Sequence, residues 1–105
     1  MDEKKIWSMF GLAKRAGRVE TGSLPVEKCI KAYRAFLVVV AADASDRTKK
    51  DLRNMCGFRD IELAEFGTKE ALGHALGAGA ERSAAAVTDE GFAARIQKMI
   101  EEYSV

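Results

Sequence analysis

Apolar residues recur every three or four positions along five stretches of the chain, a pattern that predicts five amphipathic helices. The first is expected over residues 3–16, with Gly17 as the left-handed residue that follows it. The second begins within two residues of Gly22, and Gly57 is expected to end the third. Side chains that can cap the last three helices are Ser45, Thr68 and Asp89. The residues expected to face the core are Ile6, Met9, Phe10, Ala13, Val26, Cys29, Ile30, Tyr33, Thr48, Leu52, Met55, Cys56, Ala71, Leu72, Ala75, Leu76, Phe92, Ile96, Met99, Ile100 and Tyr103.

Four short segments between these helices predict strands, at residues 19–21, 35–42, 61–63 and 83–88. The second segment is a continuous apolar run rich in valine, which is typical of a strand that helices cover on both faces. Strands and helices alternate in the order αβαβαβαβα. We therefore expect an α/β protein, a three-layer α/β/α sandwich around a mixed four-stranded sheet that is largely parallel.

The carboxyl ends of the strands are where ligands bind in such sheets. These ends are expected at residues 21–22, 42–43, 64–65 and 88–89. The first is distinctive because Gly22 joins a strand directly to a helix, an arrangement that points unpaired N–H groups and the positive helix dipole outward. Lys28, Lys31 and Arg34 fall outside the apolar face of that helix and are free to meet solvent or a polyanion. We expect function at this junction.

Composition places the chain among ordinary globular proteins. Its 105 residues are enough for a single domain over residues 1–105, and 17 basic against 16 acidic residues leave a net charge of only +1. Charge is nevertheless segregated, with six basic and two acidic residues between Lys14 and Arg34 and an excess of acids from Glu81 onward. Solvated helix faces would give the same pattern, so charge alone does not establish a nucleic-acid site.

The two cysteines, Cys29 and Cys56, lie on apolar stripes of different predicted helices. One histidine and no Cys-x-x-Cys argue against a zinc site, so buried free thiols in a reducing compartment are the simplest interpretation. There is no apolar run of about 18 residues and no recognisable signal peptide. We expect a cytoplasmic protein that does not contact membranes.

Catalytic signatures are missing from the sequence: there is no nucleophile–base set, no phosphate-binding loop and no dinucleotide fingerprint. Asp43 fits a turn or capping role better than a catalytic one, and His74 fits a polar helix face. Trp7 lies beside an apolar stripe, which favours packing over stacking on a nucleobase. These observations favour binding over catalysis, with no cofactor.

Several motifs together resemble the kink-turn RNA-binding superfamily of ribosomal proteins, of the L7Ae and L30e type. They are residues 11–19, the Thr21-Gly22 pair, residues 36–45, residues 48–50, Cys56, residues 72–77 and residues 89–93. The match runs in order along nearly the whole chain and is closest to a small bacterial YlxQ-like branch associated with translation. The fold that this resemblance implies is the α/β/α sandwich predicted above.

In this superfamily the first strand–helix junction carries a Gly-x-Asn-Glu-x-x-Lys pattern whose Asn and Glu read the guanines of sheared G·A pairs. Here Gly22 and Lys28 match the pattern, but Leu24 and Pro25 occupy the positions of the base readers. Leucine cannot hydrogen-bond a base edge and proline lacks a backbone donor, so we expect recognition of a standard kink-turn to be weakened or lost. Residues 78–82 correspond to a second contact loop, in which Ala78 replaces a frequent lysine.

We expect a non-catalytic RNA-binding protein that is a monomer when free and acts on structured RNA, ribosomal or kink-turn-like, with ribosomal or translation proteins as further partners. The residues that the resemblance and the charge pattern assign to RNA are Gly22, Ser23, Leu24, Lys28, Lys31, Lys14, Arg15, Arg34 and Arg82. A different hypothesis is a protein-interaction module, with Leu24, Pro25 and Trp7 as an apolar docking patch and the acidic C-terminal half facing a basic partner. A small α/β enzyme has the least support.

Overall fold

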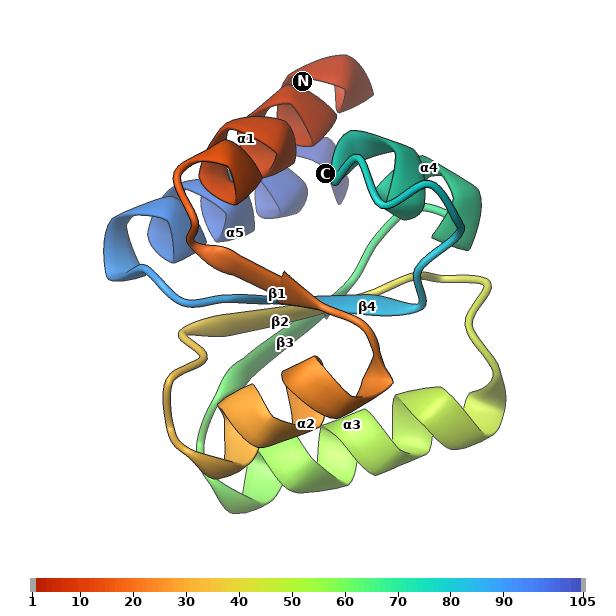
Figure 1. Cartoon of the computed structure of the whole chain (residues 1–105). Helices are drawn as coiled ribbons and strands as arrows, with labels where there is room; N and C mark the ends of the chain where they lie inside the picture. The colour runs from red at the N-terminus through yellow and green to blue at the C-terminus, as the bar shows by residue number, and fades with distance from the viewer. Residues whose placement is uncertain (1, 105) are drawn as a thin grey trace.

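The fold of residues 2–104 is described by a computed structural model, and it is the predicted α/β/α sandwich (Figure 1). Its elements are α1 (Glu3–Arg15), β1 (Val19–Thr21), α2 (Ser23–Lys31), β2 (Leu37–Val40), α3 (Asp46–Phe58), β3 (Glu62–Glu65), α4 (Lys69–Ala75), β4 (Ala84–Val87) and α5 (Glu90–Ser104). The predicted order is confirmed. The second strand is shorter than its apolar run, and the third lies further along the chain than predicted. No helix in residues 2–104 combines the length and the apolar character that crossing a membrane requires.

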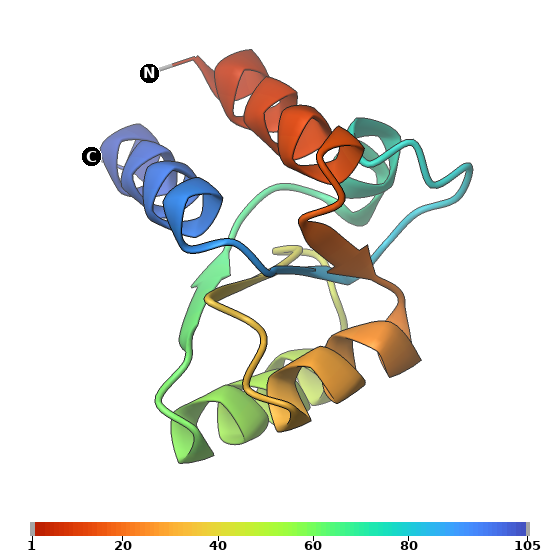
Figure 2. The same cartoon turned by 60° about the vertical axis from the view of Figure 1, so that its left-hand side comes forward.

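The sheet is mixed, as predicted, but the expectation that it is largely parallel is wrong. Its strand order is β1-β4-β2-β3, and only β2 and β3 pair in parallel. The strand β4 lies between β1 and β2 and runs antiparallel to both (Figure 2). Consequently β1, β2 and β3 end at one edge of the sheet, and β4 begins there.

The direction of β4 follows from the short connection that precedes it. The helix α4 has seven residues, and the chain then turns back on itself instead of crossing the sheet. The backbone N–H of Arg82 donates to the carbonyl oxygen of Lys69, 3.0 Å away, so the chain has returned to the start of α4 before β4 begins. A strand that starts where the previous strand ended must run in the opposite direction.

Two hydrophobic cores lie on opposite faces of the sheet. The helices α1, α4 and α5 cover one face and α2 and α3 cover the other (Figures 1 and 2). In β2, Leu37 and Val39 point into the first core while Val38 and Val40 point into the second. The four side chains are fully buried, which confirms that β2 is covered on both faces.

The predicted caps are confirmed. Side-chain oxygens of Ser45, Thr68 and Asp89 accept hydrogen bonds from the N–H groups three residues later, at 3.1, 3.0 and 2.8 Å. Gly17 follows α1 with φ of 74° and allows its Schellman-type ending.

Two helix ends differ from the prediction. Gly57 does not end α3; the helix continues to Phe58 and Asp60 adopts the left-handed conformation, with φ of 57°. The helix α2 stops at Lys31, so Tyr33 is not on its apolar face. Tyr33 is itself left-handed, with φ of 57°, and its side chain points to solvent.

The free cysteines Cys29 and Cys56 are buried, as predicted. Burial raises the pKa of the Cys29 thiol and raises the pKa of the Cys56 thiol to about 11, although nearby Arg34 and Arg59 act in the opposite direction.

We therefore expect neither thiol to react with Ellman's reagent at about pH 8 in the folded protein, since thiolate and access are both lacking. Both should react once guanidinium chloride unfolds the chain. Rapid reaction of one thiol equivalent under native conditions would contradict this burial.

Candidate functional site

The Gly22 junction lies at the edge of the sheet where β1, β2 and β3 end. There the hydroxyl of Thr21 donates to the carbonyl oxygen of Ala84 at 3.0 Å, and the N–H of Ala41 donates to Ser83 O at 2.8 Å. These bonds tie the ends of β1 and β2 to the start of β4. The fourth predicted strand end, residues 88–89, does not belong here, because β4 runs the other way and ends at the opposite edge.

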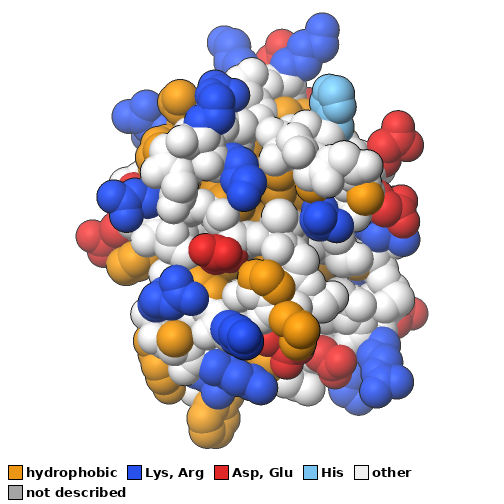
Figure 3. Space-filling view, in the orientation of Figure 1, with side chains coloured by type: hydrophobic (Ala, Val, Ile, Leu, Met, Phe, Trp, Pro, Cys, Tyr) orange, Lys and Arg blue, Asp and Glu red, His pale blue; other side chains and the backbone are white. Residues whose placement is uncertain are grey.

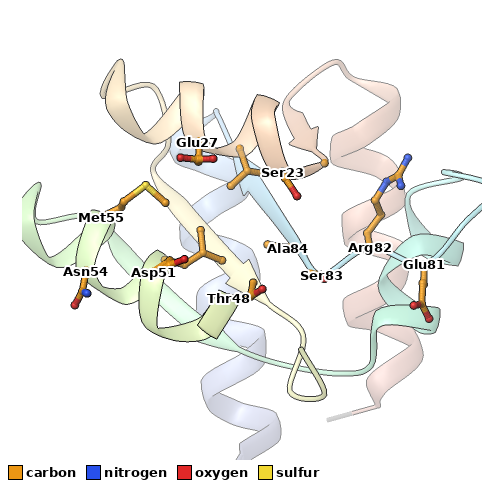
Figure 4. Close-up of a pocket in the computed structure, with 13 residues that line it drawn as sticks. Ser23, Glu27, Thr48, Asp51, Asn54, Met55, Glu81, Arg82, Ser83 and Ala84 are labelled. Carbon is orange, nitrogen blue, oxygen red and sulfur yellow. The ribbon is translucent and has the colours of Figure 1, made fainter. Parts of the chain in front are cut away.

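A cleft of about 520 Å³ opens beside this junction (Figure 4). Its walls come from α2, from α3 and from the segment that enters β4. The residues that line it are Gly22, Ser23, Val26, Glu27, Thr48, Asp51, Leu52, Asn54, Met55, Glu81, Arg82, Ser83 and Ala84. Segments far apart in the sequence therefore meet at the first strand–helix junction.

The first turn of α2 is open to a ligand. Gly22 is the N-cap with φ of 101° and ψ of 153°, a conformation that requires glycine, and it brings no side-chain hydrogen bond to the helix start. The other four helices of the described chain each receive such a bond. The N–H groups of Ser23 and Leu24 thus have no helical partner, while Pro25 has no N–H to offer. Two free donors and the helix dipole favour an anion at this point.

Arg82 adds a positive charge at the same end of the cleft. Its neighbour Glu81 also lines the cleft and forms an exposed ion pair with Lys69 at 3.6 Å, which only partly offsets the negative charge of Glu81. The Nε of Arg82 is buried and has no hydrogen-bond partner within residues 2–104. In Figure 4, Arg82 stands across the cleft from the α3 residues, with Ser23 between them. The positive guanidinium of Arg82 beside the uncapped start of α2 favours an anion at this end of the cleft.

The opposite end of the cleft is acidic. Glu27 on α2 and Asp51 on α3 line it, and each forms an ion pair within its own helix, with Lys31 at 3.7 Å and with Arg47 at 4.0 Å. These exposed pairs are weak, so the carboxylates keep much of their effect on a ligand. A phosphate is therefore favoured at the Arg82 end and disfavoured between α2 and α3.

The structure brings together three of the predicted site residues and separates others. Gly22, Ser23 and Arg82 share the cleft, and Leu24 projects beside it with 67% of its side chain exposed. Lys28 and Lys31 lie on the exposed face of α2, and Arg34 follows the end of that helix.

Two basic residues of the predicted site, Lys14 and Arg15, lie in the last turn of α1. That helix packs on the other face of the sheet, so these two side chains are not neighbours of the α2 lysines. Figure 3 shows basic side chains on both α1 and α2. The positive residues therefore form two groups, of which the α2 group continues directly from the Gly22 junction.

The other candidate residues have structural contacts. Trp7 packs against Phe10 and Phe66, with ring centroids 5.6 and 5.0 Å apart, and its Nε1–H donates to Glu3 at 3.0 Å. The prediction that it packs is confirmed, and it is not part of a docking patch with Leu24, which lies on the other layer. Asp43 accepts a bond of 2.8 Å from Lys69 N–H, the capping type of role that was predicted.

The contribution of α3 to the cleft was missed from the sequence. Thr48, Asp51, Leu52 and Met55 follow the i, i+3, i+4 and i+7 spacing of one helix face, and Asn54 lies beside it, three residues after Asp51. This spacing was a usable signal, but hydrophobic patterning assigned Thr48 and Met55 to the core and left the polar members of the face unassigned. This face of α3 lies next to α2 only because both helices pack on the same face of the sheet.

A family model describes most of this chain: the one for the ribosomal protein L7Ae/L30e/S12e/Gadd45 family matches residues 4–97. The chain belongs to this family. The family predicted from the motifs is thereby confirmed. Among curated relatives, the RNA-binding protein YlxQ of Bacillus subtilis (strain 168) is 34% identical over 93 residues, which cover 89% of this chain and 92% of the relative. The RNA-binding protein YlxQ of Enterococcus faecium is 29% identical over 100 residues, covering 95% of each chain.

Solved structures share the fold. A protein of unknown function from Bacillus halodurans C superposes with a TM-score of 0.89 at 35% identity and covers 94% of this chain and 99% of its own. The 15.5kD RNA binding protein of Giardia lamblia has a TM-score of 0.78 at 22% identity, with 97% and 92% covered. At 22% identity, the similarity to the Giardia lamblia protein shows only that the two chains share a fold.

Proposed function

We propose that this protein is a non-catalytic RNA-binding protein of the L7Ae and YlxQ type, which holds structured RNA at the Gly22 junction. Its two curated relatives carry RNA-binding names, and the chain matches the family over residues 4–97. The observation that carries the proposal is the meeting of an uncapped helix start with the positive side chain of Arg82 in one cleft. The two free thiols suit a cytoplasmic protein, and the family suits a role in translation.

In this proposal the RNA backbone is the main ligand. A phosphate accepts hydrogen bonds from the N–H groups of Ser23 and Leu24 and from the guanidinium of Arg82. Lys28 and Lys31 then attract the phosphates that follow along α2. Phosphate contacts of this kind position an RNA without reading its sequence.

Base readout at the junction is weak in this proposal. Leu24 and Pro25 occupy the two positions at which the family pattern has asparagine and glutamate, and neither side chain can hydrogen-bond a guanine edge. The exposed Leu24 can still pack against an unstacked base. We infer backbone-dominated binding with reduced preference for standard kink-turns, each lost base contact being worth about 1–3 kcal/mol.

Restoring the base readers should restore that preference. The double substitution Leu24→Asn with Pro25→Glu is expected to increase discrimination between a hairpin with tandem G·A pairs and the same hairpin with Watson–Crick pairs by about tenfold or more. Both positions are exposed, so the fold should tolerate the change. Fluorescence anisotropy with the two labelled hairpins measures the ratio. An unchanged ratio in a folded variant would mean that the junction does not face the G·A pairs.

The direct test of the proposed function is a titration of the wild-type protein with labelled ribosomal RNA fragments at several salt concentrations. We expect binding whose log K falls linearly with log salt, with a slope of about −0.7 to −0.9 for each phosphate contacted. An absence of binding at low salt, or affinity independent of salt, would refute the proposal.

A protein-interaction module is the competing function, and the exposed side chains of Leu24 and Pro25 are the observation in its favour. Affinity capture from a cell lysate, with and without nuclease, separates the two functions. Partners lost on nuclease treatment support RNA as the ligand, and partners that survive it support the protein module.

A further inference from the structure

An exposed aromatic patch lies at the far end of α2, remote from the Gly22 junction. It consists of Tyr33, Phe58 and Arg59, at the ends of α2 and α3. The side chains of Phe58 and Tyr33 are 82% and 65% exposed, more than most large hydrophobic side chains of the protein. Figure 3 shows hydrophobic atoms gathered at this corner of the molecule, at lower left, next to lysine and arginine side chains.

Arg59 organises the aromatic patch. Its guanidinium carbon lies 5.9 Å from the ring centre of Tyr33 and 5.5 Å from that of Phe58. Its Nη1–H donates to Met55 O at 3.1 Å, which anchors the side chain, while its Nε is buried without a hydrogen-bond partner in the described chain. The Arg59 guanidinium thus lies over both rings, and both aromatic residues remain mostly exposed to solvent.

The backbone at Tyr33 indicates that the patch is more than an ordinary helix end. A φ of 57° is unfavourable for a tyrosine, and glycine or asparagine would adopt it more readily. Burial of the ring does not compensate, because most of it is exposed. Strain at an exposed aromatic residue is a reason to look for a ligand.

A path of positive charge links the aromatic patch to the Gly22 junction. Lys28, Lys31 and Arg34 lie along α2 or just beyond it, and the helix is about 13 Å long. An RNA strand held at the junction can follow these cations to the aromatic patch. Exposed aromatic rings next to a basic track are what proteins use to bind single-stranded nucleic acid.

We propose that Tyr33, Phe58 and Arg59 form a second RNA contact, a stacking site for unpaired nucleobases of a strand that leaves the Gly22 junction along α2. This inference rests on the proposed function, since the junction supplies the primary contact. The exposed rings stack on bases, Arg59 contributes its positive charge and planar guanidinium, and the α2 cations neutralise the phosphates between the two contacts. Stacking tolerates any base, so the site requires a single strand and no particular sequence.

The test compares two labelled RNAs, a blunt hairpin with tandem G·A pairs and the same hairpin carrying an oligouridine tail. The variant is Tyr33→Asn with Phe58→Ala; asparagine tolerates the left-handed backbone, and residue 58 remains helical. We expect the wild-type protein to bind the tailed hairpin more tightly than the blunt one. The variant should lose roughly fivefold to a hundredfold of affinity for the tailed hairpin, and nothing for the blunt one.

Leu12→Ala is the matched control, because Leu12 is an exposed hydrophobic residue of α1 on the other layer. It should leave both affinities unchanged, and thermal unfolding should show all variants folded. A 4-thiouridine in the tail should crosslink to the peptide that contains Phe58.

The two proposals fail in different ways. Equal affinity for tailed and blunt hairpins, with no effect of the variant, would overturn the stacking site and leave the Gly22 junction intact. Failure to bind the blunt hairpin, with oligouridine alone still bound and lost in the variant, would refute the junction and support the stacking site. If the variant weakens both RNAs equally, the aromatic patch is not a separate contact and the stacking proposal is wrong.

Discussion

Gly73→Ala is expected to lower the free energy of unfolding by about 2–3 kcal/mol, a large effect for one added methyl group. Gly73 is buried in α4, where the chain returns toward β4. A Cβ there would overlap the carbonyl oxygen of Ala80 and come within 2.9 Å of the Cα of Glu81. These are backbone atoms, which cannot move aside without displacing the loop that carries Arg82.

The same substitution at Gly57 should have the opposite sign. Gly57 is helical, in α3, and a Cβ built there meets no atom within 4 Å. Alanine restricts the unfolded chain and favours the helix, so we expect Gly57→Ala to raise the free energy of unfolding by about 0.5–1 kcal/mol.

Urea denaturation followed by the fluorescence of Trp7 measures both variants against the wild type. Equal m-values would show that the changes act on stability alone. If Gly73→Ala were no less stable than Gly57→Ala, the close approach of α4 and residues 80–81 would be wrong. Because residue 82 follows this contact, a folded Gly73→Ala protein should also bind RNA more weakly than the wild type.

Charge reversal on α2 is expected to have the largest effect on RNA affinity. Lys28→Glu with Lys31→Glu removes two cations from the track that begins at the Gly22 junction. In the wild type the Lys31 ammonium lies 3.7 Å from the Glu27 carboxylate. The substitution Lys31→Glu replaces this ion pair by a repulsion between two negative charges one helical turn apart. We expect affinity to fall by about tenfold or more, and the slope of log K against log salt to become less steep by roughly 1.4–1.8.

A control with the same change of net charge is available on α5. Arg95 and Lys98 are exposed and have the same i, i+3 spacing, but their helix covers the other face of the sheet. Arg95→Glu with Lys98→Glu should leave both affinity and slope close to those of the wild type. Equal losses in the two double variants would indicate a general charge effect, and no loss in the α2 variant would exclude α2 from the RNA contact.

Much of the fold was predictable because it is determined by local patterns. The valine run of β2, the capping side chains at Ser45, Thr68 and Asp89 and the helical spacing of apolar residues act within a few residues of sequence. Each identifies an element by itself. The same is true of Gly22, since a glycine between a strand and a helix points to an open helix start wherever the helix packs.

The wrong predictions concern the ends of helices, which depend on how neighbouring elements pack. Tyr33 fits the apolar spacing of α2, but the helix ends two residues earlier because the chain must turn there to enter β2, and the ring is left exposed. Gly57 resembles a helix end, yet α3 runs past it and Asp60 makes the turn. Hydrophobic periodicity gives the face of a helix and not the residue at which packing stops it.

The sequence by itself determined the elements of this protein, their order, the two-sided burial of β2 and the open start of α2, because each depends on local spacing and capping. Only the tertiary structure decided the direction of β4, which follows from the early return of the chain beside α4. Because the chain returns there, Arg82 lies in the same cleft as Gly22, which is 60 residues earlier in the sequence. The packing of both helices on one face of the sheet places α2 beside α3. A binding cleft made of such distant segments depends on how the layers pack, and no local pattern contains that information.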